Sequence, residues 1–340
     1  MARADVTCTD ATYYDSDVGD CVACPTGYDA NTTAGKTSIN ECQIACAAGT
    51  KLLSGYENIE YLQSSGTQWI DTGYKHTSDN IRGHIKIGTI SATTSKFDIL
   101  GNQQGDANNL PRKGYSVGWN KGFKVWVNSG SGSNLVGPNW AITANGTYEF
   151  EYELDSSNRT ITYYPDTSKT ATGAHPGDIQ TDNVNLMLFK AHSIGNTRWT
   201  GRIYSFQLYE DNNLVLDLIP VRRKSDGTLG MLDKLTGTFL TNSGTGTFTT
   251  NANYTRTDVA ACIPVGTGHY NGVTVTNYGS VGTYNDCPAG TYNNTTNATS
   301  INDCLPCSGA TYNDETAQAA CKACPTGYTA NTTPGKTAVN

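Results

Sequence analysis

Hydrophobic and polar residues alternate with a period of two along the middle of the chain, from about residue 55 to about residue 250. This is the period of a β-strand with one buried face. Short strands of this kind, separated by turn residues and with no βαβ spacing, predict an all-β antiparallel two-sheet jelly-roll sandwich. The strands are expected within residues 59–74, 81–90, 96–103, 115–128, 147–155, 159–165, 183–193, 202–210 and 214–221.

The two ends of the chain lack this alternation and hold all the cysteines. Five of the eleven cysteines lie in the first 46 residues, six follow residue 261, and the 215 residues between have none. Segments without apolar periodicity cannot bury a core, and small secreted modules then depend on disulfides. Three domains are therefore predicted: a cysteine-rich module at 1–50, the sandwich at 51–255, and loop-dominated cysteine-rich modules at 256–340.

The cysteine-rich ends repeat one another. CPTGYDANTTAGKTSINEC at 24–42 recurs as CPAGTYNNTTNATSINDC at 287–304 and as CPTGYTANTTPGKTAVN at 324–340. CTDATYYD from Cys8 likewise parallels CSGATYND from Cys307. Turn residues fill the gaps between the cysteines, which indicates an array of disulfide-closed loops.

Aligning the repeats assigns the disulfides. Cys46 and Cys262 remain at the edges of the cysteine-free middle, because Tyr284 stands where a cysteine is expected ahead of Cys287. The sandwich is therefore predicted to be inserted inside one disulfide loop. The mate of Cys324 is expected two residues beyond Asn340, so that a longer protein with more repeats is predicted. The expected pairs are Cys8–Cys21, Cys24–Cys42, Cys46–Cys262, Cys287–Cys304 and Cys307–Cys321, with Cys324 unpaired.

Zinc is the alternative for these cysteines. Three C-x2-C pairs have the spacing of structural zinc knuckles. Histidine is scarce, with five in the chain, and the neighbouring sequence is rich in Thr, Asn and Gly. These features favour disulfides and secretion.

The CPxGxY…C core of these segments resembles the ephrin-receptor-like cysteine-rich repeats of large surface proteins. The resemblance covers about the first 46 and the last 80 residues. It implies a stalk or spacer and says nothing about activity.

The middle of the chain resembles concanavalin A-like, laminin-G-like jelly-roll domains of bacterial and phage surface proteins. The segments that carry the resemblance are 59–74, 201–239 and 241–248. It implies a lectin-like binding or adhesion protein whose partner is a glycan or a glycoprotein. The alternative is a structural or assembly protein that contacts another surface protein and has no glycan ligand.

A sugar site needs an exposed aromatic face beside polar groups. In the strand 123–128, Trp126 falls on the polar side with Lys124, opposite Phe123 and Val125. The alternative is that Trp126 packs under a loop. The candidate ligand-binding residues are Trp126, Lys124, Asn128, Arg112 and Asn120.

Glycoside hydrolysis is a further alternative. Glu149, Glu151, Glu153 and Asp155 alternate with apolar residues, and alternate side chains on a strand stand about 7 Å apart. Glycosidases place their two carboxyl groups at about this separation. The glucanase pattern E-x-D-x-x-E is absent, however, and the histidines show no HExxH spacing. A solvated acidic face, and no enzyme activity, is the expectation.

Charge and hydropathy exclude two classes of partner. The formal net charge is −7 and the strongest basic run is Val221–Lys224, so no nucleic acid is expected. No apolar run approaches the roughly 20 residues that span a bilayer. The prediction is an extracellular or cell-surface protein without a cofactor. The resemblance allows calcium, for which Asp106 and Asp211 in acidic loops are the candidate ligands, although hairpin turns use the same residues.

Overall fold

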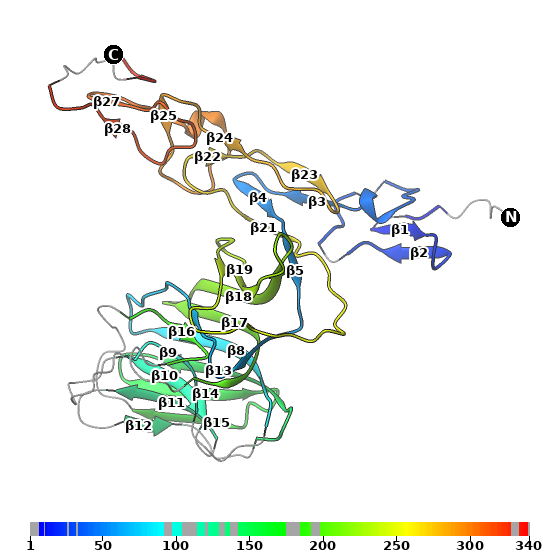
Figure 1. Ribbon diagram of the computed structural model, residues 1–340, viewed down its shortest axis with the longest axis vertical. Coiled ribbons are helices and arrows are strands. Elements are labelled where there is room, and N and C mark those ends of the chain that lie inside the picture. The colour runs from blue at the N-terminus through cyan, green and yellow to red at the C-terminus, as the bar shows by residue number, and fades with distance from the viewer. Residues whose placement is uncertain are drawn as a thin grey trace. The chain divides into compact units, whose positions relative to one another are not determined.

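A computed structural model gives the structure of the chain, and the chain is all-β, as predicted (Figure 1). It divides into two compact units, Glu57–Arg256 and Met1–Tyr56 with Thr257–Asn340. The cysteine-rich ends thus belong to one unit. The residues that the structure describes are 7–9, 11–25, 27–31, 33–91, 97–103, 114–119, 122–128, 133–136, 142–174, 184–191, 198–327 and 333–338.

The central unit is an antiparallel two-sheet sandwich. One sheet has six strands in the order β12-β11-β10-β9-β16-β7. These strands are β7 (Ile70–Asp71), β9 (Phe97–Gly101), β10 (Tyr115–Trp119), β11 (Phe123–Asn128), β12 (Ser133–Val136) and β16 (Met187–Leu188).

The other sheet has ten strands and follows the order β15-β14-β13-β8-β17-β18-β19-β20, with β5 paired to β18 and β6 paired to β17. Its strands are β5 (Tyr56–Asn58), β6 (Leu62–Ser65), β8 (Ile81–Thr89), β13 (Thr147–Leu154), β14 (Asn158–Tyr164), β15 (Thr170–Ala174), β17 (Thr200–Glu210), β18 (Asn213–Arg223), β19 (Leu229–Asp233) and β20 (Phe239–Leu240).

The alternation of β13 shows how the sheets form a core. Phe150 and Tyr152 are fully buried, whereas the glutamates that alternate with them, Glu149, Glu151 and Glu153, point to the other face. Phe150 stacks on Phe123 of the six-stranded sheet, with ring centroids 4.8 Å apart. The hydroxyls of Tyr152 and Tyr115 lie 3.0 Å apart across the same interior. Burial of these rings stabilises the packing of the two sheets.

A polar cluster lies in this sandwich beside the aromatic core. Glu210 accepts hydrogen bonds from the Tyr74 hydroxyl and from the main-chain N–H groups of Thr77 and Ser78. His76 is buried between the rings of Tyr74 and Tyr115, and among the described residues neither of its ring nitrogens has a partner. Burial therefore lowers the pKa of His76 to about 4, against the opposing charge of Glu210.

All five predicted disulfides are present in the cysteine-rich unit, and Cys324 is free. The insertion of the sandwich inside the Cys46–Cys262 loop is therefore confirmed. The two short 3-10 turns, η1 (Ile39–Glu41) and η2 (Ile301–Asp303), precede Cys42 and Cys304 at matching positions of the repeat. A strand pair also joins β3 (Gln43–Cys46) to β23 (Thr274–Asn277).

Five loops of this unit close with the same strand pair. In each loop that has a disulfide, the first cysteine stands at the opening position and its disulfide partner at the closing position. The strand pair joins the fourth and fifth residues after the opening position to the two residues after the closing position. The pairs are β1 (Thr12–Asp15) with β2 (Asp20–Ala23), β4 (Thr50–Leu53) with β21 (Ala261–Pro264), β22 (His269–Tyr270) with β24 (Asn285–Asp286), β25 (Thr291–Tyr292) with β26 (Leu305–Pro306), and β27 (Thr311–Tyr312) with β28 (Lys322–Ala323).

One of these five loops has no disulfide. In the loop closed by β22 and β24, the opening position is Val265, which is fully buried like Cys287 and Cys307, and the closing position is Tyr284. The loop has a glycine three residues after the opening position, as the Cys46 and Cys287 loops do. A Cβ on Gly268 would lie 2.2 Å from a main-chain oxygen, so only glycine fits there. Val265–Tyr284 is thus a repeat in which the cysteine pair has been replaced.

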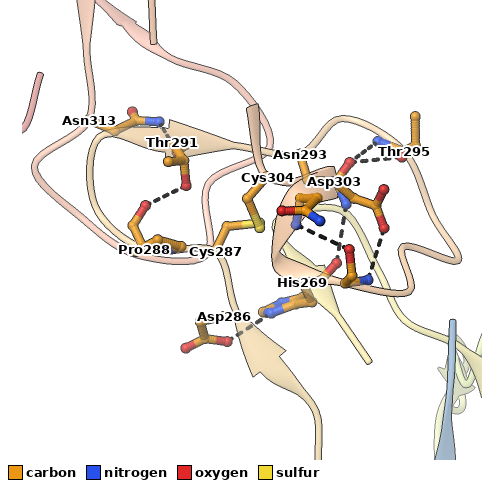
Figure 2. The surroundings of a disulfide bond; sticks show 12 residues. His269, Asp286, Cys287, Pro288, Thr291, Asn293, Thr295, Asp303, Cys304 and Asn313 are labelled. Carbon is orange, nitrogen blue, oxygen red and sulfur yellow. Dashed lines mark hydrogen bonds and ion pairs between the residues drawn. A yellow bond between two sulfur atoms is a disulfide. The ribbon is translucent and has the colours of Figure 1, made fainter. Parts of the chain in front are cut away.

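Buried asparagines join successive loops. The side-chain Nδ2 of Asn271, Asn293 and Asn313 donates to a main-chain carbonyl of the preceding loop, on Thr50, His269 and Thr291 respectively. Figure 2 shows Asn293 beside the Cys287–Cys304 disulfide, reaching His269, and Asn313 reaching Thr291. These bonds satisfy the amide groups of the buried asparagines in each repeat. The cysteine-rich unit is therefore an array of loops held together by polar side chains as well as by disulfides.

Candidate functional site

The predicted sugar site around Trp126 is not an exposed face. Trp126 is 3% exposed and Lys124 is 5% exposed. Arg112 and Asn120 lie outside the described residues, and only the main chain of Asn128 is described, at the end of β11. The expectation of an exposed indole on the polar side of this strand is therefore wrong.

The reason is that β11 is covered on both faces. Phe123, Val125 and Val127 are buried on the core side, and Lys124 and Trp126 are buried on the other. Alternation along a strand distinguishes two faces but does not show whether the second face is solvated. A buried Trp126 offers no ring face on which a sugar can stack.

The outer face of the ten-stranded sheet carries a polar cluster instead. It lies on β8 and β13, which pair so that His84 is opposite Glu151. Nε2 of His84 lies 2.8 Å from Oε1 of Glu149, and its Nδ1 lies 3.9 Å from Oε2 of Glu151. Glu151 also accepts a hydrogen bond of 3.0 Å from Arg82. Two strands that are distant in sequence thus bring together four ionisable side chains.

Arg82 connects this cluster to an aromatic ring. Its guanidinium carbon lies 4.0 Å from the centroid of the Tyr209 ring on β17. Stacking on the ring leaves the guanidinium planar and fixed, and its edge remains able to donate hydrogen bonds. Arg82 and Tyr209 are both half-buried, so that they remain accessible from solvent.

The pKa shifts of this cluster follow from its pairing. Interaction with Glu151, and then with Glu149, raises the pKa of His84. His84 and Arg82 in turn lower the pKa of Glu151. A glycosidase needs one carboxyl group with a raised pKa as its general acid. Glu151 has the opposite shift, and its contacts with Arg82 and His84 are those of an ion-pair network.

A pocket adjoins the cluster at the edge of the sheet. It has a volume of about 310 Å³ and lies where β8 begins, β13 ends and β17 turns into β18. Its polar lining combines side-chain amides, carboxylates and one guanidinium, which are the groups that hydrogen-bond sugar hydroxyls. The lining residues are Asn80, Ile81, Arg82, Glu153, Leu154, Asp155, Asp211 and Asn212.

The carboxylates of the pocket differ in their partners. Asp211 accepts hydrogen bonds from the Ser78 hydroxyl and the Asn80 amide, and Asp155 accepts them from the N–H groups of the turn that follows it. Glu153 is exposed and has no partner among the described residues. The pocket therefore has one carboxylate that is available to a ligand and two that shape its walls.

The structure describes one of the two predicted calcium ligands. Asp106 lies outside the described residues. Asp211 has a positive φ of 48° in the β17–β18 turn, and its bonds to Ser78 and Asn80 hold that turn. Within the described ranges, no group of three or more His, Cys, Asp or Glu side chains is placed to hold a metal ion.

The sequence interpretation missed Arg82, His84 and Tyr209 as a group. The sequence does place Arg82 and His84 on the polar face of an alternating strand, and it places the aromatic Tyr209 on the polar face of another. Strand order decided their grouping. The pairing of β8 with both β13 and β17 is not visible in local patterns.

No protein-family model matches the sequence, and no curated protein is significantly similar to it. Among solved structures, the enzymatically active domain of tailspike protein 2 of bacteriophage CBA120 is 8% identical with a TM-score of 0.32, over 49% of this chain and 29% of that chain. Full-length tailspike protein 2 from the Escherichia coli O157:H7 bacteriophage CAB120 is 10% identical with a TM-score of 0.33, over 53% of this chain and 30% of that chain.

Scytalido-glutamic peptidase, in complex with a peptide-based transition state analog, is 10% identical with a TM-score of 0.24, over 65% of this chain and 98% of that chain. The chain spans less than a third of the length of the two tailspike proteins. All three TM-scores are below 0.5, so these likenesses carry no argument about fold or activity.

Proposed function

We propose that the chain is a surface-displayed binding protein, in which the sandwich binds a glycan or glycoprotein and the cysteine-rich loop array serves as a stalk. The five disulfides indicate a secreted or extracellular setting, because such bonds persist in oxidising compartments. In the described part of the chain, no helix has the length and apolar character to cross a membrane.

The pocket beside Tyr209 carries the proposal. Sugar recognition combines hydrogen bonds from planar amide, carboxylate and guanidinium groups with contact on an aromatic ring. Asn80, Asn212, Glu153 and Arg82 supply the first set, and Tyr209 stands next to Arg82. The hydrogen bonds that hold the β17–β18 turn prepare the pocket before any ligand binds, which lowers the entropy cost of binding.

A glycan array with the full chain tests this proposal. Binding to a set of related glycans is expected, and Glu153→Ala should weaken it at least several-fold because Glu153 loses its hydrogen bonds to the ligand. Glu315→Ala is the matched control, since it removes an exposed carboxylate from the cysteine-rich unit. The proposal fails if the array shows no binding, or if both variants bind like the wild type.

One observation favours a second role, in contacts between proteins. Val273, Val275 and Val281 are 69%, 56% and 72% exposed within a single repeat of the cysteine-rich unit. Exposed apolar side chains that lie close together in sequence are typical of interaction surfaces. Light scattering of the full chain across a concentration series tests it. Self-association that Val275→Ser abolishes would support assembly, and a monomer at every concentration would count against self-assembly.

A further inference from the structure

Two cations on the outer face of the ten-stranded sheet have no acidic partner. Lys86 on β8 and Arg202 on β17 form no ion pair with any of the residues that the structure describes. Arg82 and Arg223 of the same sheet do have one: Arg82 pairs with Glu151, and Arg223 pairs with Asp226. The acidic residue opposite Lys86 in register is Glu149, whose carboxylate is engaged by His84. In a chain of net charge −7, two neighbouring unpaired cations call for an explanation.

Aromatic side chains frame these cations. The guanidinium carbon of Arg202 lies 4.7 Å from the Tyr61 ring centroid, and the Tyr61 and Tyr204 rings meet edge to face at 5.5 Å. Nζ of Lys86 lies 5.9 Å from the centroid of the Tyr204 ring. The pairing of β17 with β8 shifts at Tyr204, and the Tyr204 ring lies beside Gly88 of β8.

The sheet makes room for this ring. A Cβ on Gly88 would lie 3.0 Å from the Tyr204 ring and 3.3 Å from Cβ of Arg202, so glycine lets both side chains approach the strand closely. Gln63 accepts a hydrogen bond of 2.8 Å from Nε of Arg202. That bond orients the guanidinium and leaves its two terminal NH₂ groups to form a fork toward a ligand.

We propose that Lys86, Arg202, Tyr204, Tyr61 and Gln63 form a subsite for a carboxylated sugar, such as a uronic acid residue of an acidic polysaccharide. The terminal nitrogens of Arg202 match the two oxygens of a carboxylate, and Lys86 adds a second positive charge. The Tyr204 ring provides the apolar contact for the pyranose. This inference rests on the proposed glycan-binding function and names its ligand class.

Binding of oligogalacturonate to the full chain, compared with a neutral oligosaccharide of equal length, tests the inference. Oligogalacturonate should bind more tightly, and its affinity should fall as salt is added. Because a hydrogen bond to a charged group is worth about 1.5–3 kcal/mol, Arg202→Gln should weaken binding at least tenfold. Lys86→Gln should also weaken it. Arg223→Gln, which removes a cation that already has a partner, is the control and should bind like the wild type.

Two further comparisons make the outcome decisive. Equal affinity for a single-stranded oligonucleotide would overturn the inference, because the site would then recognise negative charge alone. Equal affinity for neutral glycans and oligogalacturonate, unchanged in Arg202→Gln and Lys86→Gln, would overturn the inference and keep the proposed function. Absence of binding to any glycan would overturn both. Thermal unfolding of each variant confirms that the fold is retained.

Discussion

Cys46 and Cys262 are bonded to each other although they lie 216 positions apart in the sequence, and their Cα atoms lie 5.4 Å apart. The strands that leave these cysteines, β4 and β21, pair from Thr50 with Pro264 to Leu53 with Ala261. The same strand pair closes other loops of this unit, so the array continues through this loop as it does through the others. The sandwich is therefore an insertion in one loop of a continuous repeat.

Removal of this disulfide by Cys46→Ala and Cys262→Ala should loosen the array and leave the sandwich intact. All five tryptophans lie between residues 57 and 256, so their fluorescence reports the sandwich alone. Loss of a native disulfide costs roughly 2–5 kcal/mol. The main-chain amides of β4 should then exchange with solvent faster, while the urea midpoint followed by tryptophan fluorescence should stay unchanged. A large fall in that midpoint would contradict the insertion, and Cys324→Ser is the control.

Cysteines introduced at Val265 and Tyr284 should form a disulfide. Since Val265 and Tyr284 occupy the opening and closing positions of a loop that has the common strand pair, Val265→Cys with Tyr284→Cys should oxidise spontaneously. The thiol count should equal that of the wild type, in which Cys324 is free. The loop-entropy model expects a gain of about 3 kcal/mol for a loop of this size. Two additional free thiols would refute the equivalence, and Val265→Cys alone should show one.

The buried asparagines should matter far more than their exposed neighbours. Asn293→Ala removes the bond to His269 and the acceptor for the N–H and hydroxyl of Thr295. An unpaired buried group costs about 1–3 kcal/mol, so amide exchange around the Cys287–Cys304 loop should accelerate. Asn294→Ala changes an exposed residue and should stay within about 0.5 kcal/mol of the wild type. Equal effects of the two substitutions would show that these bonds do not stabilise the array.

The sequence allowed many strands of the sandwich, the all-β class and every disulfide to be predicted, because those features depend on local alternation and on a repeated cysteine spacing. The equivalence of Val265 with Cys287 emerged only from strand pairing, since a valine carries no mark of the repeat. Trp126 was assigned to the wrong environment because β11 is covered on both faces. The grouping of His84 with Glu149 and Glu151 required the order of strands in the sheet.

The sandwich should lose stability in mild acid because of His76. Its pKa is about 4 in the folded state and 6.5 ordinarily, so the unfolded state binds more protons between these values. The free energy of unfolding should therefore fall as the pH drops from 6.5 toward 4, by up to roughly 3 kcal/mol from this group.

Tryptophan-monitored urea unfolding at pH 7 and pH 4.5 measures this loss. His76→Phe should reduce the difference between the two pH values, whereas His269→Phe in the cysteine-rich unit should leave it unchanged. Part of the acid loss should remain in His76→Phe. Burial raises the pKa of Glu210, but the hydrogen bonds from Tyr74, Ser78 and Thr77 outweigh it and lower that pKa overall. An unaltered pH dependence in His76→Phe would contradict this assignment.

Peptide mapping of the intact protein without reductant tests the central claim most directly. After proteolysis, the peptide that contains Cys46 should be found joined to the peptide that contains Cys262, and to no other cysteine peptide. Cys46 joined to Cys24 or to Cys42 would contradict the insertion of the sandwich into the repeat array.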